Sequence, residues 1–437
     1  MITTAFFAMW MVLPAAQPAQ SNAIRSAADF FRPESATSGI QEAIDALPPT
    51  GGVVKIASGT WVLRRGIVVR PHVALRGDGA TTVLTRGKQA DAKLTRPARK
   101  GELQVDVESS DGFRPGDEVA VLDDTMHGWY MAHAIVKEVL PHQLTFTEPL
   151  VSRHPEGLFS LERHAVVVNF FPFIRGSQRS WGEPVTDLVI ADLTIDSNLC
   201  ENPGPWTDFT LAAIHLSNAS DATVRHVTIR GSVGDGIGVQ GGQDNRVEDC
   251  LVEYCRGHGL HPGTSLRHAV FTHNVSRHNE GDGLYFCAVV VGITVSENLL
   301  HDNASSGIGG LGEGNDRFNV VANNVCRHNG RWGIRALAGR DNVVIGNTCF
   351  DNSQKQPGQL AGILVADSTH TLVSGNRCGS LADEPSQRFG IEEQGKSDAN
   401  LFVGNLCEGN LQGGIVTVGS RTQVSGNVGS VVQPGSK

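Results

Sequence analysis

The chain has 437 residues, of which 40% are hydrophobic, and it carries a formal net charge of -9. Its length is sufficient for one large folded body, and its 51 glycines are typical of a structure rich in turns. The acidic balance argues against a nucleic-acid-binding protein, which normally concentrates basic residues on one face. An anionic ligand would have to be received by a local basic patch rather than by the overall field of the protein.

Residues 1–21 contain an apolar stretch followed by Ala-Gln-Pro-Ala-Gln-Ser. This pattern predicts a signal peptide, and hence a secreted or periplasmic protein, although no Lys or Arg precedes the apolar stretch. A wrongly assigned start codon is the alternative interpretation. No other segment approaches the roughly 20 apolar residues that a membrane-spanning helix needs, so we expect no membrane span.

Residues 28–96 are expected to form an N-terminal cap and the first coils of a repetitive body. Ile40, Ala43, Ile44 and Leu47 fall at helical spacing, and the apolar stripe that they form could close the open end of that body. Short runs of Val, Ile and Leu punctuated by Gly follow, and they predict strands.

Residues 97–162 alternate in the manner of antiparallel strands and predict a small β insertion packed on the repetitive body. A loop within it carries Trp129 among acidic and histidine residues. An exposed aromatic ring can stack on a sugar ring, so Trp129 is a candidate substrate-binding residue. The alternative is an aromatic anchor that is partly buried.

Residues 163–430 contain nearly the same unit about nine times, from Ala213 onward. From Gly236 on, successive Gly-Ile or Gly-Leu starts lie 23, 24, 24, 26, 29, 28 and 24 residues apart. A period of this size indicates a solenoid whose units stack on one another. Each unit holds short alternating apolar runs between turn residues, which predict strands and leave no room for a helix. Residues 431–437 form a short, mostly polar tail.

Asparagines and cysteines recur in fixed registers of these units. Asparagine tolerates left-handed backbone and can bond to neighbouring amides, so a stacked ladder of asparagines is expected at a corner of each unit. Two such registers hold Asn274, Asn298, Asn324, Asn347, Asn376, Asn405 and Asn427, and Asn279, Asn303, Asn329, Asn352 and Asn410. Cys326, Cys349, Cys378 and Cys407 share one register and predict an inward stack. Cys250 and Cys255, in one unit, are the candidates for a disulfide.

The units resemble the right-handed parallel β-helix repeats of the pectate-lyase-like superfamily, and the resemblance covers roughly residues 28–430. It implies an all-β fold, a right-handed parallel β-helix solenoid with a helical cap and a β insertion. The superfamily includes polysaccharide lyases, uronan C5-epimerases, polygalacturonase-type hydrolases and non-catalytic proteins. The resemblance thus implies a polysaccharide partner, but one scaffold carries many chemistries. No oligomeric state is predicted.

A candidate site follows from the alternation of side chains along a strand. If the Ile or Leu after each Gly points inward, the next residue points outward, and all such residues share one face. On this face and its adjoining turns we predict catalytic roles for His261, Tyr285, Asp282, Arg335, His258 and Asp235. We predict substrate-binding roles for His215, Glu313, Trp332 and Glu392.

β-Elimination or C5 epimerisation of a uronate suits these residues. The reaction needs a cation that neutralises the sugar carboxylate, a base that removes the C5 proton, and an acid. Arg335 is the predicted neutraliser, His261 the base and Tyr285 the acid, with Asp282 or Asp235 orienting an imidazole. Ca²⁺ held by Asp235, Asp282 and Glu313 could share the neutralising role, since it favours oxygen ligands.

The string HGLHPGTSLRHAVFTHN resembles the stretch of mannuronan C5-epimerases that carries an Asp-Pro-His-Asp motif. Pro262 is retained, whereas His261 stands in place of the first Asp, Gly263 in place of the histidine base and Thr264 in place of the second Asp. The resemblance therefore implies epimerase chemistry only if His261 substitutes for the missing base.

Two other functions stay open. Asp235 and His258 lie in GDGIGV and CRGHGL, which resemble the Gly-Asp-Asp and Gly-His-Gly stretches of polygalacturonases, but Gly236 stands in place of the second Asp. A glycoside hydrolase needs two carboxylates across the scissile bond. The third possibility is a non-catalytic carbohydrate-binding or cell-surface β-helix.

Overall fold

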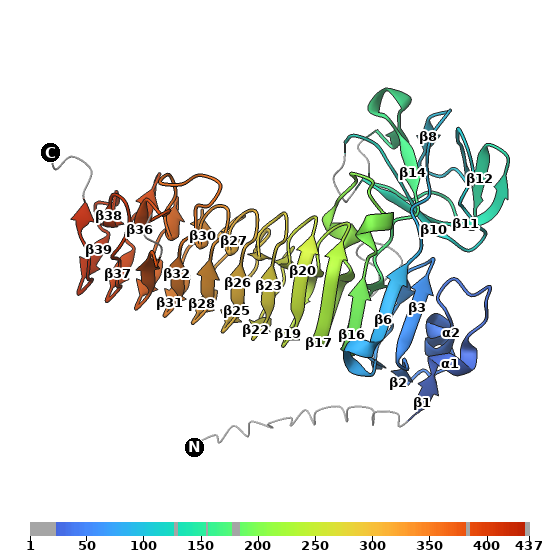
Figure 1. Ribbon diagram of the computed structural model, residues 1–437, viewed down its shortest axis with the longest axis horizontal. Helices are drawn as coiled ribbons and strands as arrows, with labels where there is room; N and C mark the ends of the chain where they lie inside the picture. The colour runs from blue at the N-terminus through green and yellow to red at the C-terminus, as the bar shows by residue number, and fades with distance from the viewer. Residues whose placement is uncertain (1–22, 126–129, 154–155, 177–183, 382–384, 433–437) are drawn as a thin grey trace, which may run out of the picture.

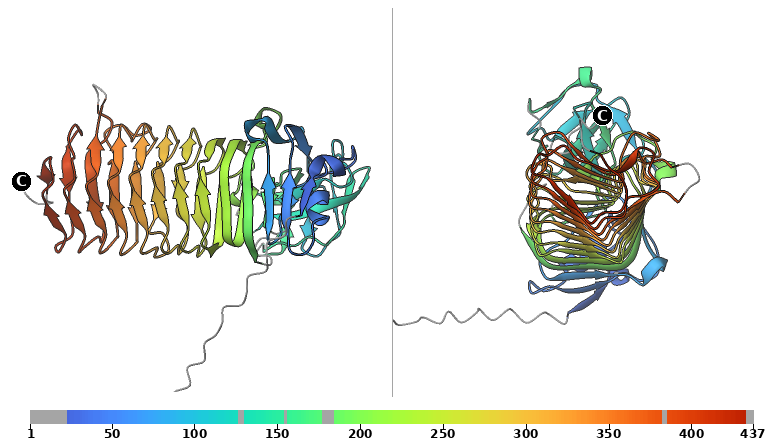
Figure 2. Two further views of the ribbon diagram at one scale, coloured as in Figure 1. Left: turned by 90° about the horizontal axis from the view of Figure 1, so that it is seen from below. Right: turned by 90° about the vertical axis from the view of Figure 1, so that its left-hand side faces the viewer.

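A computed structural model describes residues 23–125, 130–153, 156–176, 184–381 and 385–432. The signal peptide predicted over residues 1–21 lies outside these ranges, as do Trp129 and most of the predicted polar tail. The described chain is a parallel β-helix, a long solenoid of stacked rungs (Figures 1 and 2), so the predicted fold class is confirmed. No helix in the described ranges is long and apolar enough to cross a membrane.

Three rows of strands run along the solenoid, and each strand pairs in parallel with its equivalent in the next rung. The first row begins with the Gly-Ile or Gly-Leu starts of the units. It contains β4 (Ile67–Val68), β15 (Ile174–Arg175), the start of β17 (Ile214–Ser232), β18 (Ile237–Gln243), β21 (Leu260–Gly263), β24 (Leu284–Tyr285), β27 (Ile308–Leu311), β30 (Ile334–Leu337), β33 (Ile363–Ala366), β36 (Phe389–Gln394), β38 (Gly413–Val416) and β40 (Val431–Val432).

The other two rows complete each rung, and the long strands β16 and β17 contribute to both. The second row contains β1 (Ile24–Ser26), β2 (Gly52–Lys55), β5 (Val73–Arg76), β16 (Val185–Asp196), β17, β19 (Arg246–Glu248), β22 (Val270–Thr272), β25 (Thr294–Ser296), β28 (Val320–Ala322), β31 (Val343–Ile345), β34 (Leu372–Ser374), β37 (Leu401–Val403) and β39 (Gln423–Ser425). The third contains β3 (Gly59–Leu63), β6 (Thr82–Arg86), β16, β17, β20 (Leu251–Cys255), β23 (Val275–Arg277), β26 (Leu299–His301), β29 (Val325–Arg327), β32 (Thr348–Phe350) and β35 (Arg377–Gly379).

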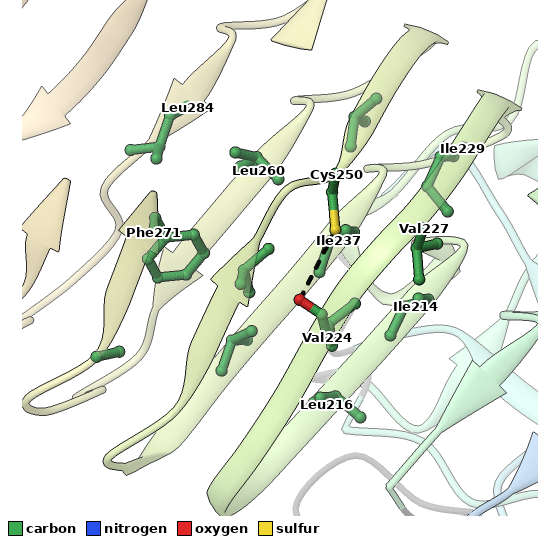
Figure 3. Packing of buried hydrophobic residues seen from close by; sticks show 14 of the residues in the cluster. Ile214, Leu216, Val224, Val227, Ile229, Ile237, Cys250, Leu260, Phe271 and Leu284 are labelled. Carbon is green, nitrogen blue, oxygen red and sulfur yellow. Dashed lines mark hydrogen bonds between the residues drawn. The ribbon is translucent and has the colours of Figure 1, made fainter. Parts of the chain in front are cut away.

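The core is a stack of apolar side chains inside the solenoid. Ile214, Ile237, Leu260 and Leu284 follow one another in register in the first row, and each is fully buried (Figure 3). Burial of these side chains removes apolar surface from water, which is the main stabilising contribution to such a fold. It also fixes the alternation that turns the next residue of each strand outward.

The predicted cysteine stack is present. Cys326, Cys349 and Cys378 pair in register, and Cys407 follows them in the core. All eight cysteines are free. The candidate disulfide between Cys250 and Cys255 is therefore not formed. Cys250 Sγ instead contacts the Val224 carbonyl oxygen at 3.7 Å (Figure 3).

The predicted asparagine ladders are also present. At each step the backbone N–H and the side-chain amide of one asparagine both donate to the side-chain oxygen of the next, as Asn298 does to Asn324 at 3.0 and 2.9 Å. In the second ladder Gln387 fills the rung between Asn352 and Asn410, where the sequence shows no asparagine. The ladders satisfy polar groups that the corners would otherwise bury without partners.

The N-terminal end is covered by two helices, α1 (Ala27–Phe30) and α2 (Ile40–Asp45). Ile40, Ala43, Ile44 and Leu47 are buried in the solenoid core, as the helical stripe predicts. Elsewhere in the described ranges lie four short 3₁₀ turns, η1 (Gly79–Thr81), η2 (Leu161–Arg163), η3 (Leu199–Glu201) and η4 (Phe209–Leu211).

An antiparallel sheet stands beside the N-terminal rungs (Figure 1) and includes most of the predicted insertion. Its strands, in spatial order, are β7 (Asp91–Lys93), β14 (Val166–Val168), β10 (Glu118–Leu122), β11 (Ala132–Leu140), β12 (Gln143–Phe146) and β9 (Gln104–Asp106). β8 (Ala98–Arg99) pairs with β13 (Leu158–Phe159). The sheet has a separate apolar core.

Candidate active site

The outward positions of the first row form one line along the solenoid, which we call the outward line. From rung to rung it holds Arg175, His215, Gly238, His261, Tyr285, Gly309, Arg335, Leu364 and Glu392. Five of the predicted site residues therefore occupy equivalent positions, namely His215, His261, Tyr285, Arg335 and Glu392. Adjacent rungs are about 4.8 Å apart, so the neighbours His261 and Tyr285 are close, with ring centroids 5.2 Å apart.

A buried ion pair lies at the centre of the outward line. Asp235 Oδ2 is 2.5 Å from His261 Nδ1, and the two residues are 2% and 4% exposed. Burial lowers the pKa of His261, but the charge and hydrogen bond of Asp235 outweigh burial and raise that pKa to about 10. The same partnership keeps the pKa of Asp235 below its ordinary value, although burial raises it. At neutral pH the pair is charged.

His258 lies against the ring of Tyr285. The two rings are stacked, with centroids 4.3 Å apart and planes 10° apart. The backbone N–H of His258 donates to Asp235 Oδ1 at 2.7 Å, and the Asp282 N–H donates to His258 Nδ1 at 2.9 Å. Burial lowers the pKa of His258 despite the nearby carboxylates. The Asp282 N–H therefore favours the neutral tautomer that carries its proton on Nε2.

Tyr285 donates its hydroxyl proton to Glu313 Oε2. Burial and this bond to a carboxylate both raise the pKa of Tyr285 above its ordinary value. Tyr285 is consequently a neutral phenol whose proton already points at an acceptor. The backbone that brings Glu313 to this position is the turn after β27, which begins at Gly312 with a φ of 111°.

Two glycines of the outward line flank its central residues. At Gly309, between Tyr285 and Arg335, a Cβ atom would lie 2.3 Å from Asp282 Oδ2. At Gly238, between His215 and His261, it would lie 3.6 Å from His215 Nδ1. The Asp282 carboxylate therefore occupies the space that a side chain at residue 309 would need, whereas the contact at Gly238 is an ordinary van der Waals distance.

The N-terminal side of the site is covered by the segment that contains η4. The Phe209 ring lies 6.1 Å from His215 and 5.9 Å from His261, measured between centroids. Burial and the nearby His261 charge lower the pKa of His215 to about 4, so His215 is neutral. Burial raises the pKa of Asp208 to about 6. Sequence reasoning missed Asp208 and Phe209, because they belong to an irregular excursion rather than to a repeat.

Sequence reasoning also missed the residues that fasten the insertion to the outward line. Arg175, the first charged member of that line, forms a buried ion pair with Glu118 of β10. His133 Nδ1 of β11 lies 3.4 Å from Glu118 Oε1, and the Gly66 N–H donates to Glu118 Oε2. Burial raises the pKa of Glu118, but Arg175 outweighs it and the pKa falls to about 2. An ion pair between a repeat and an insertion follows no periodic pattern, so the sequence alone does not reveal it.

The C-terminal side of the outward line is rich in cations. Arg335 is two rungs beyond Tyr285, a distance of about 10 Å along the solenoid. Its guanidinium carbon is 5.5 Å from the centroid of the Trp332 ring, and that of Arg331 is 4.5 Å away. Glu392 is two rungs further and lies 3.8 Å from Arg388. These residues do not touch the Asp235–His261 pair.

The structure does not support the predicted calcium site. Within the described ranges no group of three His, Cys, Asp or Glu residues is arranged to hold a metal. The carboxylates of Asp235, Asp282 and Glu313 are instead directed to His261, to the Ser306 N–H at 2.5 Å and to the Tyr285 hydroxyl. Each therefore has another partner.

Comparison with known proteins agrees with this architecture. The profile of a family described as "Right handed beta helix region" matches residues 189–316 and 292–428. No curated protein matches the sequence significantly.

Among solved structures, the chain is similar to the A-module of the mannuronan C-5 epimerase AlgE6 of Azotobacter vinelandii, with 16% identity and a TM-score of 0.58. That match covers 94% of this chain and 99% of the A-module. The AlgE4 A-module of the same organism is 17% identical, with a TM-score of 0.55 over 92% of this chain and 100% of its own. PfbA, a surface adhesin of Streptococcus pneumoniae, is 12% identical, with a TM-score of 0.55 over 93% and 89%. At sequence identities this low, the structural similarity shows that the fold is shared and nothing further.

Proposed function

Since the chain belongs to the right-handed β-helix family, we propose that its outward line is the active site of an enzyme acting on a uronate-containing polysaccharide. The inferred reaction removes the C5 proton of a uronate and leads to β-elimination or to epimerisation at C5. The observation that supports it best is the proximity of His261, paired with Asp235, to Tyr285, bonded to Glu313. A cation and a hydrogen-bonded proton relay thereby lie in adjacent rungs.

In this proposal His261 is the neutralising cation and proton donor rather than the base. Its pKa of about 10 makes it an imidazolium at neutral pH. A fixed positive charge beside the sugar carboxylate stabilises the enolate that forms when the C5 proton leaves. Within the described chain, His261 Nε2 has no hydrogen-bond partner although it is buried. The Cys287 thiol lies near the imidazole and also raises the pKa of His261. In this proposal an oxygen of the substrate accepts the Nε2 proton.

Tyr285 and Glu313 together supply the base. The C5 proton passes to the Tyr285 oxygen while the hydroxyl proton passes to Glu313 Oε2, so that no phenolate forms and the electron pair of the C–H bond enters the enolate. In β-elimination the enolate expels the oxygen at C4, which takes the proton of His261 Nε2. In epimerisation His261 Nε2 gives its proton to the opposite face of C5, and the electron pair of the enolate forms the new C–H bond. His258, neutral and stacked on Tyr285, positions the phenol.

Hydrolysis is supported less well by this geometry. An inverting or retaining glycosidase needs two carboxylates free to face the scissile bond. Asp235 is 2% exposed and paired with His261, and Asp282 is 6% exposed and bonded to the Ser306 N–H. Neither is directed to solvent.

We further propose that the enzyme acts outside the cytoplasm, as the signal peptide predicted over residues 1–21 implies.

The proposal is tested by incubating the purified protein with pectic, alginate, glycosaminoglycan and neutral polysaccharides. Reducing ends and the absorbance of unsaturated uronates are followed together. A rise in both with a uronate polymer supports elimination, and a change in the uronate composition without cleavage supports epimerisation. Reducing ends alone would indicate hydrolysis, and binding without any chemical change would indicate a non-catalytic carbohydrate-binding protein.

A further inference from the structure

A cluster rich in hydrogen-bond donors surrounds Arg335 of the outward line. It consists of Arg331, Trp332 and Arg335, which we call the Arg–Trp–Arg cluster. The two guanidinium carbons lie 4.5 and 5.5 Å from the Trp332 ring centroid, within the range of cation–π attraction. Trp332 is 9% exposed and packs against Leu364 and Ala366. The indole thus gives both cations a rigid support.

Three N–H groups of this cluster have no acceptor in the part of the chain that the structure describes. They are Nε of Arg331, Nε1 of Trp332 and Nε of Arg335, and all three atoms are buried. Neither arginine forms an ion pair with any described residue. A buried donor without an acceptor destabilises the folded state. Three such donors gathered at one ring form a place where a ligand acceptor is favoured.

The protein has a net charge of -9. A general excess of basic residues therefore does not explain why two arginines without ion-pair partners among the described residues lie at one ring. The position of the cluster is informative as well. Arg335 follows Tyr285 by two rungs, and the rung between them carries Gly309, which presents no side chain. A polymer lying along the outward line would pass from Tyr285 over this glycine to Arg335.

We propose that the Arg–Trp–Arg cluster is an anion-binding subsite that receives the carboxylate of a second uronate of the same chain. Its identity as a uronate subsite rests on the proposed function. A carboxylate has two oxygens that accept several hydrogen bonds, and arginine bonds to it with strong, charge-assisted geometry. It would satisfy the indole and guanidinium donors together. The subsite holds the polymer and does not take part in proton transfer.

The test measures binding rather than turnover. Isothermal titration of the Tyr285→Phe variant with oligogalacturonates, oligomannuronates and oligoguluronates is compared with titration with their carboxyl-reduced counterparts. We expect the charged oligomer that fits to bind at least about tenfold more tightly than its reduced form. Adding Arg335→Gln should remove most of that preference and leave the affinity for the reduced oligomer unchanged. Trp332→Phe, which keeps a ring but removes the N–H, should weaken the charged oligomer alone by a few fold.

Arg340→Gln is the matched control, because Arg340 is exposed and already pairs with Asp341 at 3.0 Å. It should change neither affinity. Equal weakening of charged and reduced oligomers by Arg335→Gln would assign the arginine a structural role and overturn the subsite. So would the absence of any preference for a charged oligomer in the starting protein.

The two proposals can fail separately. If Arg335→Gln removes the charge preference but no uronate polymer is chemically altered, the subsite stands and the proposed reaction is wrong. If C5 chemistry is found and Arg335→Gln binds uronates as the parent does, the reaction stands and the subsite is wrong.

Discussion

Asp235 Oδ2 and His261 Nδ1 lie 2.5 Å apart in a pair that is almost completely buried. Burial alone would leave His261 neutral, whereas the carboxylate raises its pKa to about 10. The pair therefore holds an imidazolium, balanced by the Asp235 carboxylate, just beneath the outward line of an acidic protein. Around it, the outward line brings Tyr285 and Glu313 to the next position along the solenoid.

Replacement of Asp235 by Asn should shift the alkaline limit of activity to lower pH. The account needs protonated His261, so activity is present below the pKa of that residue and is lost as the pH rises through it, at about 10 in the wild type. Without the Asp235 charge, burial dominates and the pKa of His261 falls. The pH–rate profile and a ¹⁵N titration of the imidazole measure this shift. Asp244→Asn, beside the exposed His268, should leave the profile unchanged, and an unshifted limit in Asp235→Asn would contradict the assignment.

Removal of the Tyr285 hydroxyl should abolish the proton relay while the ring remains stacked on His258. We expect Tyr285→Phe to lower kcat by about 10²–10⁴-fold, which is the usual contribution of general acid–base catalysis. Glu313→Gln should act in the same direction, because it removes the acceptor of that proton. Tyr254→Phe is the control, since Tyr254 is exposed and also stacks on a histidine, His278, outside the first row. Full activity in Tyr285→Phe would exclude the relay.

A methyl group at Gly309 should block the site without unfolding the protein. The Cβ atom would lie 2.3 Å from Asp282 Oδ2, so Asp282 must move and its hydrogen bond to the Ser306 N–H must lengthen. Misplacement of groups near the reacting centre by about 1 Å can cost about 10²-fold in rate. Gly309→Ala is therefore expected to lose activity with an unchanged circular dichroism spectrum. Gly87→Ala, where the added atom meets nothing within 4 Å, should retain it; equal activities would show that the space above Gly309 is not used.

The asparagine ladder should contribute strongly to stability. Asn324→Ala removes the oxygen that accepts both the backbone and side-chain N–H of Asn298, and it removes the donor to the Val295 carbonyl. Each buried group left without a partner costs about 1–3 kcal/mol, so we expect the free energy of unfolding to fall by roughly 3 kcal/mol. Urea denaturation measures this change.

The neighbouring Asn323 provides the control for that experiment. It is exposed and has a φ of 56°, which glycine adopts without strain. Asn323→Gly should change the free energy of unfolding by less than about 0.5 kcal/mol. Similar losses for the two variants would mean that the ladder has no special role.

The repetitive part of the fold could be predicted because its causes are local. Each Gly-Ile or Gly-Leu start, each asparagine corner and each cysteine of the inward stack recurs at a fixed place, so the period alone identifies the solenoid and its outward face. The alternation along each strand then placed His261 and Tyr285 side by side. The alternation of side chains along a strand and the spacing between neighbouring strands account for this placement.

The chemistry of the site depends on contacts that the spacing of the repeats does not predict. The protonation of His261 follows from the charge and the hydrogen bond of Asp235. The three carboxylates considered for calcium each have another partner. The Glu118–Arg175 pair joins an antiparallel insertion to a parallel rung, and Phe209 belongs to an irregular excursion. Such pairings depend on how separate segments dock, which sequence spacing does not specify.

The central claim is that the outward line removes the C5 proton of a uronate. The direct measurement is nuclear magnetic resonance of uronate oligomers incubated with the protein in deuterated water, for the wild type and Tyr285→Phe. The account predicts that the wild type converts the C5–H signal of one oligomer, either to an unsaturated product or to deuterium at C5, and that Tyr285→Phe does not. Cleavage that leaves every C5–H signal intact would contradict it.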